Sequence, residues 1–223
     1  MAERVDDLQY RGLKLIQDTD EYRFGVDAVE LAAFAAVKRG AAVADIGAGT
    51  GVLSVLLAAK KGAYVTAVEL NPATAALCRK NAERNGLAGR IVTHCMRAQD
   101  APETFGRVFD AVVSNPPYFK VGSGALHARA SVAYARHELT LTLSDVADCA
   151  AALLKPSGAL YVVYPADRLA EALSAFSVRG LEPKRLQLLT PAAGKAPHLF
   201  MVQCVSGARP GLKILPERPV RAD

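Results

Sequence analysis

Apolar residues along the chain fall into short continuous runs that alternate with segments of helical periodicity. The short runs are bounded by glycine, proline or polar residues, which predicts strands at 41–46, 64–70, 91–95, 109–114 and 159–164. Apolar positions three and four residues apart predict helices at about 52–60, 73–85, 144–155 and 166–179. Strands and helices that alternate in this way predict an α/β fold with a doubly wound, mostly parallel sheet.

The N-terminal 40 residues form a short extension ahead of this alternating pattern. Apolar residues predict a strand at 13–17, and aromatic residues predict a return strand at 22–24. A helix is expected at about 28–38, where Asp27 is a good N-cap and Gly40 ends the pattern. We treat residues 1–40 as an extension that packs on the main domain.

The C-terminal part of the chain breaks the alternation. The last two strands, at 183–190 and 198–205, have no helix between them, so we expect an antiparallel pair. Residues 207–223 combine prolines with basic side chains and predict an extended basic tail, with short pairing at 212–215. The main domain therefore covers residues 41–206.

A glycine-rich turn follows the first strand of the main domain. Asp45 lies just ahead of three alternate glycines, Gly47, Gly49 and Gly51. A dinucleotide site has the spacing G-x-G-x-x-G instead, and an acid at this place would repel a pyrophosphate but suits a cationic ligand. Glycines let the main chain approach a ligand closely, and the helix N-terminus behind them offers free N–H groups. The alternative is a tight turn that serves only helix–strand packing.

Polar residues also follow the next two strands. Glu69 ends its strand about 20 residues after the glycine turn, where an acid can accept hydrogen bonds from both hydroxyls of a ribose. NAD sites use the same arrangement, so Glu69 indicates an adenosine cofactor in general. Arg97 to Asp100 follow the third strand and are expected to edge an adenine pocket, or else to form a polar surface loop.

The segment Ser114-Asn115-Pro116-Pro117-Tyr118 comes directly after the fourth strand. An exocyclic amine next to a ring is a poor nucleophile because its lone pair is delocalised. The Asn115 side-chain oxygen and the Pro116 carbonyl can each accept one of its N–H bonds, which favours the pyramidal, reactive form. Each proline fixes its own φ, so these acceptors are aimed in advance, and Tyr118 can stack on a planar substrate. Taken alone, the segment could also be an ordinary proline turn or a ligand for a WW-type domain.

Composition adds few constraints. The chain has 223 residues, a formal net charge of +5 and a pI of about 9.1, which is compatible with nucleic acid. Four scattered cysteines without a C-x-x-C motif predict reduced core cysteines and no metal site. A polar N-terminus and the lack of a long apolar run predict a cytoplasmic protein with no membrane segment.

The glycine turn resembles motif I of class I S-adenosylmethionine (SAM) methyltransferases, and Asn115 to Tyr118 resemble the (D/N/S)-P-P-(Y/F) motif of amino-group methyltransferases. The resemblance implies a seven-stranded sheet, SAM as cofactor and direct in-line methyl transfer without a metal. It assigns catalysis to Asn115, Pro116, Pro117 and Tyr118. It assigns SAM contacts to Asp45, Gly47, Ala48, Gly49, Gly51, Glu69, Leu70, Arg97, Ala98 and Asn115. The family often has an acid where Arg97 stands, and Asp100 could take its place.

A closer resemblance extends over residues 10–206. Gln17-Asp18, Tyr22 to Ala28, the two motifs above and Ala135-Arg136-His137-Glu138 together look like the bacterial tRNA(Val) adenine-N6 methyltransferase family, which modifies the adenine just 3′ of the anticodon. This resemblance implies tRNA as the partner and places Phe24 and Asp27 near the SAM pocket, although Asp27 is equally suited to a plain helix cap. Substrate contacts would come from Tyr118, Phe119, Lys120, Arg129, Arg136 and His137, with Arg23 and the basic tail near the phosphates. These charges could also be ordinary solvated side chains, and His137 a structural histidine or an acceptor of the spare proton.

Three other functions share some of these features. A protein glutamine N5-methyltransferase also uses Asn-Pro-Pro-Tyr, but about 40 residues ahead of the glycine turn are too few for its usual helical domain. An rRNA or DNA amino-methyltransferase typically carries an added recognition domain. A non-catalytic SAM-binding or nucleotide-binding module would not need Asn115 and two prolines beside the cofactor turn.

Overall fold

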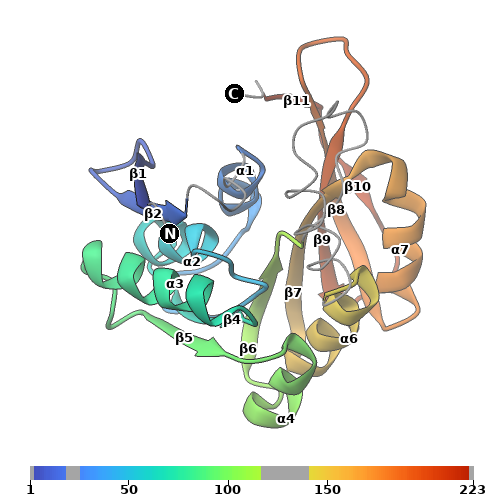
Figure 1. Ribbon diagram of the computed structural model, residues 1–223. Helices are drawn as coiled ribbons and strands as arrows, with labels where there is room; N and C mark the ends of the chain where they lie inside the picture. The colour runs from blue at the N-terminus through green and yellow to red at the C-terminus, as the bar shows by residue number, and fades with distance from the viewer. Residues whose placement is uncertain (1–2, 19–25, 117–140, 221–223) are drawn as a thin grey trace.

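The structure is a computed structural model, and it describes residues 3–18, 26–116 and 141–220. A single sheet dominates it, with strand order β10-β8-β9-β7-β6-β3-β4-β5 and β11 paired to β8 (Figure 1). Strands β3 to β7 are parallel, and β9 runs antiparallel to both of its neighbours, β7 and β8. The strands are β3 Ala42–Ile46, β4 Tyr64–Glu69, β5 Ile91–Cys95, β6 Phe109–Ser114, β7 Leu154–Pro165, β8 Leu181–Thr190, β9 Leu199–Ser206, β10 Lys213–Ile214 and β11 Arg218–Pro219.

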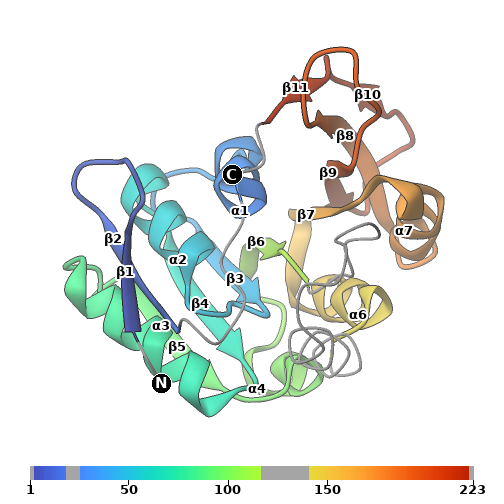
Figure 2. The ribbon, with the colours of Figure 1, turned by 45° about the horizontal axis from the view of Figure 1, so that its top comes forward.

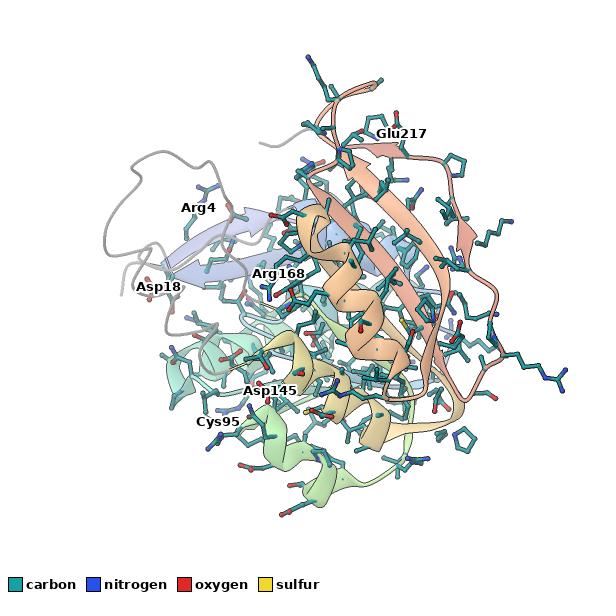
Figure 3. All side chains as sticks on the ribbon, turned by 90° about the vertical axis from the view of Figure 1, so that its right-hand side faces the viewer. Arg4, Asp18, Cys95, Asp145, Arg168 and Glu217 are labelled. Carbon is teal, nitrogen blue, oxygen red and sulfur yellow. The ribbon has the colours of Figure 1, made fainter. Side chains whose placement is uncertain are left out.

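Helices cover both faces of this sheet, as the mostly parallel strand order requires. One group is α1 Val26–Phe34, α2 Val52–Leu56 with its π-helical continuation Leu57–Lys61, and α3 Pro72–Arg84. The other group is α4 Ala101–Phe105, α6 Leu143–Leu153 and α7 Leu169–Ser177, of which α6 and α7 face the viewer in Figure 3. The core between the layers includes the fully buried Phe176 and Phe200. The predicted doubly wound α/β fold is confirmed.

Several boundaries differ from the sequence prediction. The segment after β5 was expected to be a loop, but it forms a 3-10 turn (Ala98–Asp100) and α4, because Phe105 packs edge-on against the His94 and Phe109 rings at centroid distances of 4.9 and 6.0 Å. Helix α6 begins at Leu143 and ends at Leu153, slightly earlier than the predicted 144–155, and Thr142 is its N-cap. The Thr142 Oγ1 accepts from the main-chain N–H of Asp145 at 3.1 Å, and the Asp145 carboxylate accepts from the main-chain N–H of Thr142 at 2.8 Å.

The N-terminal extension contains a hairpin that the sequence only half predicts. Strand β2 (Lys14–Asp18) is confirmed, but it pairs antiparallel with β1 (Glu3–Asp7), whose charged residues gave no strand signal. The hairpin lies alongside α2 and α3 (Figure 2). The return strand expected at 22–24 lies outside the described residues. Helix α1 ends at Phe34, earlier than expected, and Asp27 lies within its first turn, so its prediction as N-cap is wrong.

The C-terminal tail joins the sheet. The pairing expected at 212–215 is confirmed as β10, and β11 continues it, both parallel to β8. The main-chain N–H groups of Leu215 and Val220 donate to carbonyls of β8 at 2.8 and 2.7 Å. Arg218 then forms an ion pair with Glu30 of α1, which links the tail to the opposite end of the chain. The sheet therefore has the seven expected strands and two short strands from the tail at its edge.

Candidate active site

The carboxyl ends of β3, β4 and β6 meet at one edge of the sheet, because parallel neighbours end on the same side. The buried Ser114 hydroxyl, on the last residue of β6, donates to the carbonyl of Ile46, the last residue of β3, at 2.8 Å. This hydrogen bond ties the two strand ends together. It places Asn115 next to the glycine turn that begins at Gly47.

Two glycines of the turn are required by packing. Gly47 and Gly51 have φ of +71° and +85°, a conformation that strains other residues. A Cβ atom on Gly47 would lie 2.7 Å from the Leu141 side chain, and one on Gly51 would lie 2.5 Å from the Cys78 Sγ. A side chain at either position would therefore strain the main chain and require the Leu141 or Cys78 side chain to move.

Gly49 is different, because its surroundings are open. Its φ is +56°, yet a Cβ atom there would meet nothing within 4 Å among the described residues. Its main-chain N–H donates to the Glu69 Oε2 at 2.9 Å, and the Glu69 Oε1 accepts from the main-chain N–H of Asn71 at 2.8 Å. The Glu69 side chain is thus buried, and these two hydrogen bonds hold it in one orientation next to Gly49. Each carboxylate oxygen keeps capacity for a second hydrogen bond.

Asp45 lies beneath the turn and is fully buried. Its Oδ2 accepts from the Ser54 hydroxyl at 2.6 Å, whereas its Oδ1 has no hydrogen-bond partner in the part of the chain that the structure describes. Burial raises the pKa of Asp45 from 3.8 to about 7; the hydrogen bonds from Ser54 oppose this rise, and the nearby Glu69 carboxylate adds to it. Within the described ranges, no Lys or Arg forms an ion pair with Asp45 or Glu69. The site therefore favours a ligand that carries positive charge.

Asn115 has the same kind of unsatisfied oxygen. Its Oδ1 is buried and has no hydrogen-bond partner among residues 3–18, 26–116 and 141–220. A buried acceptor without a partner costs free energy, on the order of 1–3 kcal/mol, unless a ligand satisfies it. Pro116, which follows it, is also buried. The side-chain oxygen is thus available to a donor from a bound molecule.

The remaining predicted site residues differ in burial, and some of them lie outside the described residues. Leu70, after Glu69, is 41% exposed and offers an apolar surface at this edge of the sheet. Arg97 is exposed, whereas the Ala98 side chain is buried and its carbonyl accepts from the Cys149 thiol at 3.1 Å. Asp27 is buried in α1. The other predicted residues, which are Arg23, Phe24, Pro117, Tyr118, Phe119, Lys120, Arg129, Arg136 and His137, lie outside the described residues.

Two residues of this region were not singled out by sequence reasoning. Asn81 on α3 and Asn85, the C-cap residue of α3, bind the N-terminal hairpin through their side-chain amides, and Asn81 also bonds to Thr50 in the glycine turn. Their only sequence signal is the spacing of four residues, which places both amides on one face of a helix.

The sheet order, the glycine turn after β3 and the acid at the end of β4 define a class I methyltransferase. The comparisons agree with this class. Residues 28–176 match the family described as methyltransferase small domain, and the chain belongs to it. In structure it is similar to a predicted O-methyltransferase from Agrobacterium tumefaciens, with a TM-score of 0.69 and 23% identity over 86% of each chain, which supports the fold.

Relatives of similar sequence identify a more specific family of methyltransferases. The chain is 32% identical over 204 residues to the tRNA1(Val) (adenine(37)-N6)-methyltransferase of Cronobacter sakazakii, covering 89% of this chain and 81% of the relative. It is 29% identical over 195 residues to the enzyme of the same name from Shewanella baltica, covering 86% and 80%. The chain therefore belongs to the tRNA1(Val) (adenine(37)-N6)-methyltransferase family.

No helix within the described ranges is long and apolar enough to cross a membrane. The described residues also contain no group of three or more His, Cys, Asp or Glu side chains arranged to hold a metal ion.

Proposed function

We propose that this chain transfers a methyl group from SAM to the N6 amine of an adenine in tRNA, at the position just 3′ of the anticodon. The observation that carries the proposal is the buried Oδ1 of Asn115, which has no hydrogen-bond partner in the described part of the chain and follows Ser114, whose hydroxyl bonds to the end of β3. The names of the relatives support an adenine in tRNA as the substrate. Since tRNA is used in the cytoplasm, we place the enzyme there.

The residues present fit SAM. The cofactor carries a sulfonium and an ammonium group, and the turn offers the two buried carboxylates of Asp45 and Glu69 without a neutralising Lys or Arg in the described part of the chain. The Oδ1 of Asp45, which has no hydrogen-bond partner within the described ranges, suits a cationic donor. Glu69, next to Gly49, suits the ribose hydroxyls. When bound, SAM supplies an activated methyl group.

The residues of the chain act by orientation. Asn115 accepts one N–H of the substrate amine at its side-chain oxygen, and the carbonyl of Pro116 accepts the other. These two acceptors hold the nitrogen and favour the pyramidal form, in which the lone pair points at the methyl carbon. Holding reactants in line in this way contributes several kcal/mol to a transfer reaction without a covalent intermediate. As the N–C bond forms, the S–C bond would break and S-adenosylhomocysteine would leave. A strong base is not required in this scheme, because the methylated nitrogen is acidic while it is cationic and would release its extra proton to water.

A tRNA loop suits the reaction because its bases are already unpaired. An adenine in the anticodon loop can be turned into a pocket at lower cost than a base in a duplex. Two sets of substrate contacts are hypotheses from the sequence: contacts to the base from Tyr118 and Phe119, and contacts to phosphates from Arg23, Lys120, Arg129, Arg136 and the tail. His137 is a further candidate for contact with the RNA.

The substrate is tested by methyl transfer from tritiated SAM to separate targets. The targets are tRNA(Val) transcript, the same transcript with guanine at the target position, rRNA and a release-factor protein. We expect label only in the unchanged tRNA, as N6-methyladenosine after digestion. Label in the protein would indicate glutamine N5-methylation instead, and label in rRNA would reject the tRNA assignment. SAM binding without transfer to any target would indicate a non-catalytic module.

The affinity for SAM should depend on pH through Asp45. Because a cationic ligand favours the ionised form, a pKa near 7 in the free protein means that binding below pH 7 must release a proton. Affinity should fall about tenfold between pH 7 and pH 5.5 in calorimetry, with proton release visible as a dependence on the buffer's ionisation enthalpy. Asp45→Asn, which keeps an acceptor for Ser54, should lose this slope. A slope that persists in Asp45→Asn would exclude the role.

The same carboxyl affects stability in the opposite sense. Its pKa is higher in the folded protein than in the unfolded chain. Its contribution to the free energy of unfolding is therefore present below about pH 4 and is lost as the pH rises through about 7.

A further inference from the structure

Strand β2 is bonded on both of its edges, although it belongs to a hairpin of only two strands. One edge pairs with β1. On the other edge, the main-chain N–H groups of Lys14 and Ile16 donate to the Oδ1 atoms of Asn85 and Asn81 at 3.0 and 2.6 Å. The carbonyls of the same two residues accept from the Nδ2 groups of the same amides at 2.8 and 2.9 Å. The side-chain amides of Asn81 in α3 and of its C-cap residue Asn85 thus replace a neighbouring strand.

The two amides differ in one contact. Asn85 uses its second N–H within α3, on the carbonyl of Asn81 at 2.7 Å. Asn81 is fully buried and uses its second N–H on the carbonyl of Thr50, in the glycine turn, at 2.9 Å. Asn81 therefore bonds to the hairpin and to the turn at the same time.

This contact fixes one peptide group of the turn. The carbonyl of Thr50 and the N–H of Gly51 belong to the same peptide, and that N–H donates to the carbonyl of Ala48 at 2.9 Å. Both ends of the peptide plane are thus held, one by Asn81 and one by the turn itself. Because a peptide group is planar, fixing both of its ends fixes the orientation of this part of the turn. Gly49, in the same turn, is the glycine whose Cβ position has no described atom within 4 Å.

The hairpin needs support of this kind. A two-stranded hairpin is at best marginally stable in water. Its last residues, Gln17 and Asp18, are buried (Asp18 is labelled in Figure 3). Groups that are held by one shared side chain become ordered together.

We propose that Asn81 is a positioning residue that couples docking of the N-terminal hairpin to the geometry of the glycine turn. Binding of SAM at the turn then stabilises the docked hairpin, and a docked hairpin strengthens SAM binding to the same extent. The inference rests on the proposed cofactor, since it predicts a consequence of SAM binding.

The first test uses the unmodified protein. Hydrogen exchange of the main-chain N–H groups of Lys14 and Ile16 is measured by NMR with and without saturating SAM. We expect both groups to exchange about tenfold more slowly with SAM, because the hairpin opens less often. Unchanged exchange at both groups, in protein that calorimetry shows to bind SAM, would overturn the proposal.

The second test compares Asn81→Ala with Asn85→Ala as a matched pair. Both variants remove an amide that holds β2, and both should speed exchange at Lys14 and Ile16. Only Asn81→Ala should also raise the Kd for SAM, by about tenfold, because the partly buried Thr50 carbonyl in the turn loses its donor. Asn85→Ala should stay within about twofold of the unmodified protein.

The melting temperatures of the two variants, measured without SAM, show whether a change in Kd for SAM reflects a general loss of stability or the proposed coupling. If the two variants lose stability equally and their Kd values for SAM are also equal, the proposal is wrong. If Asn81→Ala does not fold, the exchange measurement on the unmodified protein decides. Failure of the unmodified protein to bind SAM would reject the cofactor assignment, which is a different result.

Discussion

Asn115→Ala should lower kcat about a thousandfold while SAM affinity stays near that of the unmodified protein. The expected loss is of the size seen when one preorganised hydrogen-bonding group is removed from an active site. The side-chain oxygen would bond the amine most strongly as the nitrogen becomes pyramidal, so its removal affects the transition state more than the ground state. Single-turnover methylation of tRNA and calorimetry with SAM measure the two quantities separately.

Asn115→Asp is the informative control for this prediction. It keeps an oxygen acceptor at the same place, and the motif that the sequence resembles accepts Asp there. We expect it to retain activity within about tenfold of the unmodified enzyme, whereas Asn115→Leu should behave as Asn115→Ala does. Near-normal turnover in Asn115→Ala would contradict the proposed mechanism.

Glu69→Ala should weaken SAM binding about a hundredfold. The carboxylate would accept from two ribose hydroxyls, and hydrogen bonds to charged groups contribute about 1.5–3 kcal/mol each, of which part is offset by desolvation. The substitution also leaves the main-chain N–H groups of Gly49 and Asn71 without their acceptor, which loosens the turn. Calorimetric titration with SAM gives the affinity, and kcat at saturating SAM should change far less.

Two variants make the Glu69 result specific. Glu83→Ala removes an exposed glutamate from α3 and should leave SAM affinity unchanged. Glu69→Gln keeps one acceptor oxygen and should fall between the unmodified protein and Glu69→Ala. An unchanged Kd in Glu69→Ala would reject the ribose contact.

Elements whose apolar runs are continuous and buried were predicted well. Strand β6 has the predicted bounds, because it lies between β3 and β7 and its composition reflects burial. Strand β5 also has the predicted bounds, although it lies at the edge of the sheet and Ile91 is its one buried residue. The antiparallel pair at the C-terminal end is also confirmed. Elements that depend on distant partners were missed: β1 is mostly charged and is a strand because β2 lies beside it, and α4 forms where Phe105 meets two rings.

The candidate site also has features that the sequence predicts and features that depend on the tertiary structure. The glycine turn, Glu69 and Asn115 were found from order along the chain, since residues that follow parallel strands must gather at one edge. The hydrogen bonding of their side chains could not be predicted in this way. Asp45 Oδ1 and Asn115 Oδ1 have no hydrogen-bond partner among the residues that the structure describes, and this depends on which groups surround them in three dimensions.

By itself, the sequence determined the alternation of strands and helices, the position of the cofactor turn and the family of methyltransferases, because these depend on local periodicity and on motifs that are contiguous in the chain. Only the tertiary structure decided that Asn81 joins Ile16 to Thr50 and that Arg218 reaches Glu30. Such contacts join residues tens to hundreds of positions apart. Their energies depend on burial and geometry, which no local pattern of residues encodes.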